Sequence, residues 1–138
     1  MSITREKAVE TVRGALASRP EIAFGYVHGS VLTSSDPGDV DVAVFLDLDA
    51  HARIREAEGI EFGFAIPLEM ELERALHHPT DLQVLNDAPL GFKFRVVQTG
   101  VVVAENDLGA RVDFEYLSRV EYFDFRPRLD EYLREAGS

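Results

Sequence analysis

Several residue types that support particular chemistries are missing from this 138-residue chain or scarce in it. There is no cysteine, which excludes disulfide bonds, a thiol nucleophile and a Cys-based zinc site. This composition suits a reducing compartment. No apolar stretch approaches the ~18 residues of a membrane span, and the N-terminus has the pattern of an amphipathic helix rather than of a signal peptide. We therefore expect a cytoplasmic protein without a membrane partner.

Positive charge is also scarce. The chain has 14 Lys and Arg residues against 25 Asp and Glu residues, and its net charge at pH 7 is −11. A surface of this charge repels a phosphate backbone, which disfavours direct binding to nucleic acid or to an anionic membrane surface. Hydrophobic residues make up 46% of the chain, enough for a domain of this length to build its own core. We expect a single domain over residues 1–138.

Helical and extended patterns alternate along the sequence. Apolar spacing and helix stop signals predict helices over residues 4–18, within 52–77, over 89–98, and in a C-terminal helical segment at about 107–134. Apolar, β-prone runs predict strands over residues 22–27, 39–46, 81–85 and 101–104. Gly59, Gly63 and Pro67 are expected to break the region 52–77 into two helices. The alternation predicts an α+β or α/β class, with helices flanking a small mixed β-sheet.

The strongest predicted strand carries two carboxylates at its start. In residues 39–46 (DVDVAVFL), Asp39 and Asp41 are two positions apart, so both project from the same face of the strand. Two carboxylates this close repel each other unless one is protonated or a cation lies between them. Mg²⁺ prefers such oxygen ligands. An isolated Asp-x-Asp also occurs in turns and at solvated strand ends, so a second feature is needed to indicate function.

That second feature is Gly29-Ser30, which follows the strand predicted over 22–27 and is separated from Asp39 by eight residues. Glycine has no Cβ, so a phosphate group can approach the backbone closely. The N–H groups at the start of a following helix and the serine hydroxyl offer hydrogen bonds to the same anion. A phosphate-binding turn beside a carboxylate metal site indicates metal-assisted phosphoryl or nucleotidyl transfer.

In this order, His28-Gly29-Ser30 and Asp39-Val40-Asp41 resemble the signature of the nucleotidyltransferase superfamily that includes DNA polymerase beta. That superfamily has a third carboxylate on a later strand, and Asp81, which opens DLQVL, matches this place. The chain is similar over roughly residues 4–134 to the small members called minimal nucleotidyltransferases, or MNT proteins. The resemblance implies a polymerase beta-like nucleotidyltransferase fold.

The same resemblance implies a function. MNT proteins are commonly antitoxins, and their partners are helical HEPN-domain toxins with ribonuclease character. The implied reaction transfers AMP from ATP, with Mg²⁺, to a tyrosine hydroxyl of the toxin and silences it. By resemblance, Gly29 and Ser30 hold the triphosphate, and Asp39 and Asp41 hold the metal ions. Asp81 completes the metal site and helps to activate the attacking hydroxyl.

The chain departs from this pattern shortly after the Gly-Ser pair. Many relatives have an arginine there, whereas residues 31–33 read Val-Leu-Thr, and the loop to Asp39 is slightly short. Lys93, Arg95 and Arg111 are the nearest basic candidates for nucleotide or partner contacts, and the sequence does not rank them. Relatives are often apolar at the position of His28, so we expect a histidine in the core or beside the site rather than a ligand.

The C-terminal segment is rich in aromatic residues. Its last 27 residues hold six of the chain's thirteen aromatic side chains. These six cannot all share one helical stripe, and aromatic residues are enriched at protein interfaces. We expect part of them to lie in the core and part to form a surface for a partner, or for a homodimer when the protein is free.

Two other functions are compatible with these features. The chain could neutralise its partner by direct binding, with a weak or inactive catalytic site. It could also transfer a nucleotide to a small molecule such as an aminoglycoside, although enzymes of that kind usually add a sizeable second domain. Retention of all three aspartates favours the catalytic hypothesis over the first alternative.

Overall fold

The computed structural model describes residues 3–136, except for the side chains of residues 126, 127, 129 and 130. Its helices are α1 (Arg5–Ala17), α2 (Leu48–Ala57), α3 (Ile66–Leu76), α4 (Leu90–Thr99) and α5 (Leu108–Ala136), with a 3₁₀ turn η1 (Ser30–Leu32) and a π-helical turn η2 (Glu61–Ala65). Its strands are β1 (Ile22–His28), β2 (Val40–Leu46), β3 (Thr80–Val84) and β4 (Val101–Glu105). The predicted alternation of helices and strands is confirmed.

The four strands form one mixed sheet in the order β3-β2-β1-β4. Strand β1 is antiparallel to both β2 and β4, whereas β2 and β3 are parallel. Every residue of β1 is buried, and β2 is buried at five of its seven positions. Strands of this kind are apolar on both faces because helices cover both sides of the sheet. Strand β2 is therefore central, as its sequence predicts.

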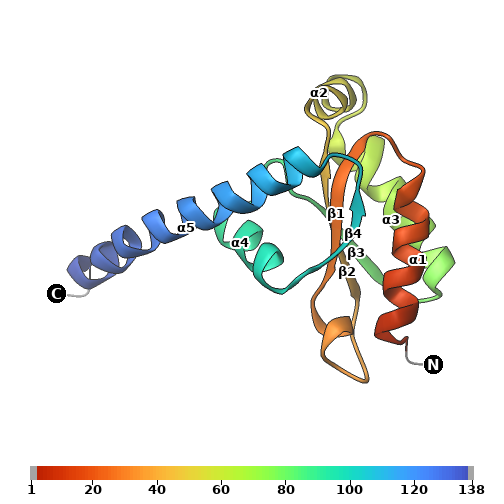
Figure 1. The fold of residues 1–138 in the computed structure, drawn as a ribbon, viewed down its shortest axis with the longest axis horizontal. Coiled ribbons are helices and arrows are strands. Elements are labelled where there is room, and N and C mark those ends of the chain that lie inside the picture. Colours follow the sequence, from red (N-terminus) through yellow and green to blue (C-terminus); the bar gives the residue numbers. More distant parts are fainter. Residues whose placement is uncertain (1–2, 137–138) are drawn as a thin grey trace.

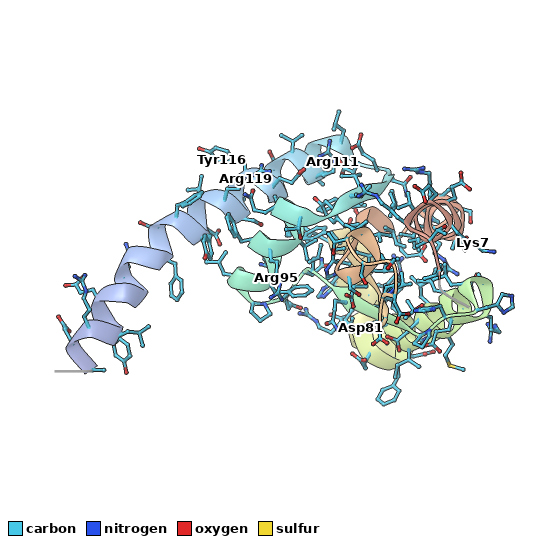
Figure 2. All side chains as sticks on the ribbon, turned by 90° about the horizontal axis from the view of Figure 1, so that it is seen from below. Lys7, Asp81, Arg95, Arg111, Tyr116 and Arg119 are labelled. Atoms are coloured by element: carbon cyan, nitrogen blue, oxygen red, sulfur yellow. The ribbon has the colours of Figure 1, made fainter. Side chains whose placement is uncertain are left out.

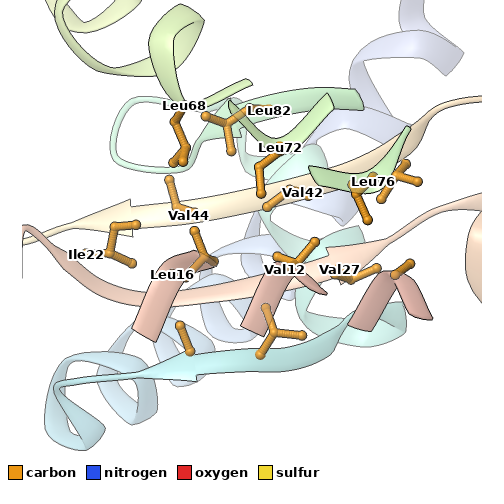
Figure 3. Close-up of a cluster of buried hydrophobic side chains, with 14 of the residues drawn as sticks. Val12, Leu16, Ile22, Val27, Val42, Val44, Leu68, Leu72, Leu76 and Leu82 are labelled. Carbon is orange, nitrogen blue, oxygen red and sulfur yellow. The ribbon is translucent and has the colours of Figure 1, made fainter. Parts of the chain in front are cut away.

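Helices α1 and α3 cover one face of the sheet, and α4 and α5 lie on the other (Figure 1). The side chain of Thr4 caps α1 by accepting a hydrogen bond from the Lys7 amide at 3.1 Å, a common way to satisfy a free N–H at a helix start. The α1–α3 side holds the larger core, shown in Figure 3, which includes Val12, Leu16, Ile22, Val27, Val42, Val44, Leu68, Leu72, Leu76 and Leu82.

Aromatic rings fill the core on the α4–α5 side. Phe24 of β1 stacks on Phe45 of β2, with ring centroids 5.0 Å apart, and both contact Phe114 of α5. These contacts fix the first half of α5 against the sheet. They also place α4 and α5 over the sheet face that carries the odd-numbered residues of β2.

The region between β2 and β3 differs in part from the prediction. The chain does break at Gly59, where φ is +85°, a backbone conformation that favours glycine. Gly63 and Pro67 do not break the helix. Gly63 lies in η2, which runs directly into α3. Pro67 lies in the first turn of α3, where the fixed φ of proline suits the helix.

The 29-residue helix α5 leaves the rest of the molecule part-way along its length (Figure 1). Its last aromatic contacts with α4 are made by Tyr122 and Phe123. The centroids of their rings lie 3.9 and 5.6 Å, respectively, from the centroid of the Phe94 ring. The remaining turns project away from the sheet (Figure 1). Across the described residues, no helix combines the length and the apolar character that a membrane span requires.

The role of α3 in the core gives a stability prediction. Leu72 is fully buried, so Leu72→Ala should lower the free energy of unfolding by about 2–5 kcal/mol, through lost apolar burial and a residual cavity. Met70 on the same helix is 52% exposed, and Met70→Ala should change it by less than about 0.5 kcal/mol. Urea unfolding of both variants measures the difference. Equal losses would show that α3 does not pack as described.

Candidate functional site

The pairing of β2 with β3 brings together two of the three predicted carboxylates. In this parallel pair, Asp41 is the register partner of Asp81. Residues in register on neighbouring strands project from the same face of a sheet. Ala43 and Phe45, which share a face with Asp41, lie in the core beneath α4 and α5. The two carboxylates therefore lie on the α4 side of the sheet, near the start of β2.

Asp39 immediately precedes β2 and belongs to the same electrostatic cluster. The pKa of Asp41 is raised above its ordinary value of 3.8, first by burial and then by the negative charges of Asp81 and Asp39. The positive charge of Arg95 acts in the opposite direction. All three predicted aspartates thus interact, and the charges of Asp39 and Asp81 disfavour the charged form of Asp41.

Gln83 is a member of this site that the sequence analysis missed. Its Nε2 donates a hydrogen bond to Asp81 Oδ1 at 2.9 Å. Gln83 lies two positions after Asp81 on the same strand, and so on the same face. That spacing is the signal that could have found it. The hydrogen bond holds the Asp81 carboxylate in one orientation.

Gly29 directly follows β1 and lies against the Asp41 carboxylate. Its φ is +82°, a conformation that other residues rarely adopt. A Cβ atom at this position would also overlap Asp41 Oδ2. From the sequence, the missing side chain of Gly29 is expected to let a phosphate approach the backbone, whereas in the structure the Asp41 carboxylate is its immediate neighbour. Glycine is therefore required here for two independent steric reasons.

Ser30 begins the short turn η1 and is exposed. Its carbonyl oxygen accepts hydrogen bonds from the amides of Thr33 and Ser34, at 3.1 and 2.8 Å. Because His28, two residues earlier, is the register partner of Asp41, the turn begins directly beside the carboxylates. Ser30 is thus an accessible hydroxyl at the edge of the acidic cluster.

His28 is buried, as the sequence predicts, with 8% of its surface exposed. Its ring meets the ring of Phe92 edge-on, with centroids 5.6 Å apart. Burial first, and then the charge of Arg95, lower the pKa of His28 below 6.5, while Asp81 raises it. Among the described residues its Nε2 atom has no hydrogen-bond partner. The histidine therefore packs between β1 and α4, in surroundings that disfavour its charged form.

The structure distinguishes the three basic candidates. Arg95 on α4 lies with its guanidinium carbon 5.6 Å from the centre of the Phe92 ring, and its charge acts on both Asp41 and His28. Figure 2 shows Arg95 and Asp81 on the same side of the molecule, and Arg111 farther away. Arg111 instead forms ion pairs with acidic side chains of β4 and α5. Lys93 lines a different cavity, beside Phe45 and Asp47 at the end of β2. Arg95 is the cation that faces the carboxylates.

The donor chemistry of the site fits a magnesium ion. As the side chains stand, the described residues contain no group of three acidic or histidine side chains placed to hold one ion. Magnesium commonly uses only one or two protein carboxylates, and substrate phosphates and water complete its shell. Asp41 and Asp81 are such a pair. A cation between them would also offset the two effects that raise the pKa of Asp41, which are its burial and then its repulsion by Asp81 and Asp39.

A cavity of about 640 Å³ opens beside Asp81, between β3, the η2–α3 segment and the start of α4. Its lining includes Gln83, Glu69 and Phe92. This volume lies within the usual range for small-molecule sites. The acidic cluster therefore borders a space that a ligand can enter.

Comparisons with known proteins agree with this geometry. The family described as "Polymerase beta, Nucleotidyltransferase" matches residues 10–108. No curated protein matches the chain in sequence. Among solved structures, the chain is similar to a toxin–antitoxin complex, MntA–HpeT, that carries two Asp-to-Glu substitutions. The two chains are 16% identical, the TM-score is 0.64, and the match covers 99% of this chain and 100% of the other.

Two further solved structures share the fold. One is described as a toxin–antitoxin with AMP-PNP, with 18% identity, a TM-score of 0.64, and coverage of 99% of this chain and 100% of the other. The second is a tri-AMPylated Shewanella oneidensis HEPN toxin in complex with MNT antitoxin. Its match has 18% identity, a TM-score of 0.60, and coverage of 97% and 96%. At these identities the structural matches establish a common fold.

The raised pKa of Asp41 predicts a pH-dependent stability. Its carboxyl is neutral in both the folded and the unfolded chain well below pH 3.8, and the folded state loses stability as pH rises through the raised pKa. Asp41→Asn removes this loss of stability.

In buffer with a metal chelator, the Asp41→Asn variant should have a higher Tm than wild type at pH 7, and the difference should shrink as pH falls. Glu10→Gln, an exposed change on α1, should show no such trend, and a lower Tm for Asp41→Asn at pH 7 would contradict the repulsion.

Proposed function

The chain belongs to the polymerase beta nucleotidyltransferase family, and on that premise we propose that it is the antitoxin of a HEPN-domain toxin. In this proposal it uses Mg²⁺ and ATP to transfer AMP to a tyrosine hydroxyl of the toxin. One observation carries the proposal: the register of β2 and β3 sets Asp41 beside Asp81, next to the Gly29 turn and facing Arg95. A carboxylate pair, a glycine turn and a cation are the parts that nucleotidyl transfer needs.

The proposed reaction is a displacement at the α-phosphorus of ATP. The tyrosine oxygen forms a new bond to this phosphorus, the bond to the bridging oxygen breaks, and pyrophosphate leaves. The tyrosine proton passes to a carboxylate, for which Asp81 is the candidate. In this proposal Gly29 and Ser30 would hold the triphosphate. Asp41 and Asp81, with Asp39 beside them, would hold Mg²⁺, which would supply charge neutralisation at the phosphates.

The structural relatives support the partner and the nucleotide. One of them contains a tri-AMPylated HEPN toxin bound to its MNT antitoxin, and another is described with AMP-PNP. Both match nearly the whole of this chain and of the other chain. Neither description names a small molecule as the acceptor of a nucleotide.

The test is label transfer from α-labelled ATP with Mg²⁺, using a HEPN-domain protein encoded beside the gene for this chain. Wild type should label that protein, and Asp41→Asn should reduce the rate by at least about 10²-fold if the metal is essential. Glu10→Gln removes an exposed charge on the opposite face of the sheet and should leave the rate unchanged. If both variants lose transfer rate to the same extent, Asp41 is not a metal ligand in the reaction.

Arg95 gives a separate prediction about nucleotide binding. Since its guanidinium faces the carboxylates, we expect it to bind a phosphate of ATP, in place of the arginine that many relatives have after the Gly-Ser pair. Arg95→Met should weaken the affinity for Mg²⁺–ATP by roughly 10- to 100-fold, the value of a charge-assisted hydrogen bond. Titration calorimetry with AMP-PNP and Mg²⁺ measures it.

The matched control for this experiment is Arg13→Met, which removes an exposed arginine from α1 on the other side of the sheet. It should bind the nucleotide with wild-type affinity. If both arginine variants bind as tightly as wild type, Arg95 does not contact the phosphates.

A contact inhibitor is the second candidate function. The exposed apolar side chains of α5, which include Leu117, Phe125 and Tyr132, favour it because an inhibitor of this kind needs only a binding surface. Tight binding of the HEPN protein by wild type, without any transfer of label, would select this function. In that case Asp41→Asn should inhibit the partner as well as wild type does.

A further inference from the structure

A second cavity, of about 590 Å³, lies between α5 and the end of β2. Its floor is apolar and includes Ala23, Phe45, Phe114 and Leu117. The charged side chains that line it are five carboxylates and one lysine: Asp47, Asp49, Asp107, Asp113, Glu121 and Lys93. The cavity thus combines an apolar floor with a strongly acidic rim.

This cavity is separate from the candidate catalytic site. Asp41 lies at the start of β2, whereas Phe45 and Asp47 lie at its end and just beyond it. At about 3.3 Å per residue, the six residues from Asp41 to Asp47 span roughly 20 Å. None of the residues assigned to nucleotide or metal binding lines the cavity.

The cavity continues onto the projecting part of α5. Leu117 lines the cavity and is 51% exposed. Glu121 and Phe125 follow at intervals of four residues, so the three lie along one face of the helix. Phe125 and Tyr132 are 48% and 66% exposed, beyond the last contacts with α4. The face of α5 that lines the cavity therefore continues onto the free turns of the helix, with apolar side chains at Leu117 and Phe125 and the acidic Glu121 between them.

We infer that this cavity and the adjoining face of α5 form a docking surface for a basic amphipathic helix of the partner protein. Apolar side chains of that helix would fill the floor over Phe45 and Phe114, and flanking Lys or Arg side chains would pair with the acidic rim. Charge complementarity selects this occupant, because five carboxylates and a single lysine line the cavity. Asp47 and Asp107 already accept hydrogen bonds from amides at the starts of α2 and α5. Asp49, Asp113 and Glu121 are therefore the carboxylates that cations of the partner would pair with.

A second copy of this chain is a poorer occupant for the same reason. Each copy carries a net charge of −11 and would bring another acidic rim to the contact. Like charges placed opposite each other at an interface cost affinity and slow association. The charge of the chain therefore points away from self-association through this face.

The identity of the partner as a HEPN-domain protein rests on the proposed function, but the location of the docking surface does not. Leu117→Asp places a charge on the cavity floor without touching the catalytic site. In the label-transfer assay it should raise KM for the HEPN protein at least tenfold and leave kcat within twofold. Affinity for Mg²⁺–AMP-PNP should be unchanged, which also shows that the variant is folded.

The matched control is Leu108→Asp. Leu108 lies on the same helix, is 55% exposed and does not line the cavity. Nine residues separate it from Leu117, which places the two on opposite faces of α5. The control should keep the wild-type KM. Equal effects of the two substitutions, or no effect of either, would overturn the docking surface.

Direct binding separates failure of this inference from failure of the proposed function. Titration calorimetry without ATP should show that Leu117→Asp weakens binding of the HEPN protein at least tenfold, even if wild type transfers no label. Asp113→Asn should make the Kd less dependent on salt. If the wild-type chain does not bind this protein, a helix of the HEPN protein is not what docks in the cavity. A homodimer in sedimentation that Leu117→Asp dissociates would show that a second copy of the chain docks there instead.

Discussion

The candidate site depends above all on the parallel pairing of β2 with β3. This register sets the carboxylate of Asp41 beside that of Asp81, although forty residues separate them in the sequence. Burial of Asp41, and then its repulsion by Asp81, raise the pKa of Asp41. The pairing is maintained by apolar contacts elsewhere, because the opposite face of both strands is buried under α1 and α3. Hydrophobic burial on one face of the sheet thus holds an unfavourable charge cluster on the other.

The α4 side of the sheet divides into two regions with different chemistry. At the start of β2, Arg95 and Phe92 of α4 lie over the carboxylates and His28. At the end of β2, the aromatic rings of Phe45 and Phe114 form the floor of the second cavity. Nucleotide chemistry and partner docking can therefore use the same sheet face without competing for residues.

The structure also changes the reason for one glycine. From the sequence, Gly29 is needed so that a phosphate can approach the backbone. In the structure its positive φ and the overlap that a Cβ would make with Asp41 Oδ2 already require glycine. The turn and the strand are therefore coupled, since a side chain at Gly29 would displace the carboxylate. A sequence read along the chain does not reveal such a contact between residues twelve positions apart.

The sequence by itself determined the order of helices and strands, the central place of β2 and the candidate residues Gly29, Ser30, Asp39, Asp41 and Asp81. These follow from local apolar periodicity and from short motifs, which act over a few residues. Only the tertiary structure decided that Arg95, rather than Lys93 or Arg111, faces the carboxylates. It also decided that Gln83 orients Asp81 and that α5 extends beyond the sheet. These features depend on strand register and helix packing, which join residues distant in the sequence and leave no local pattern.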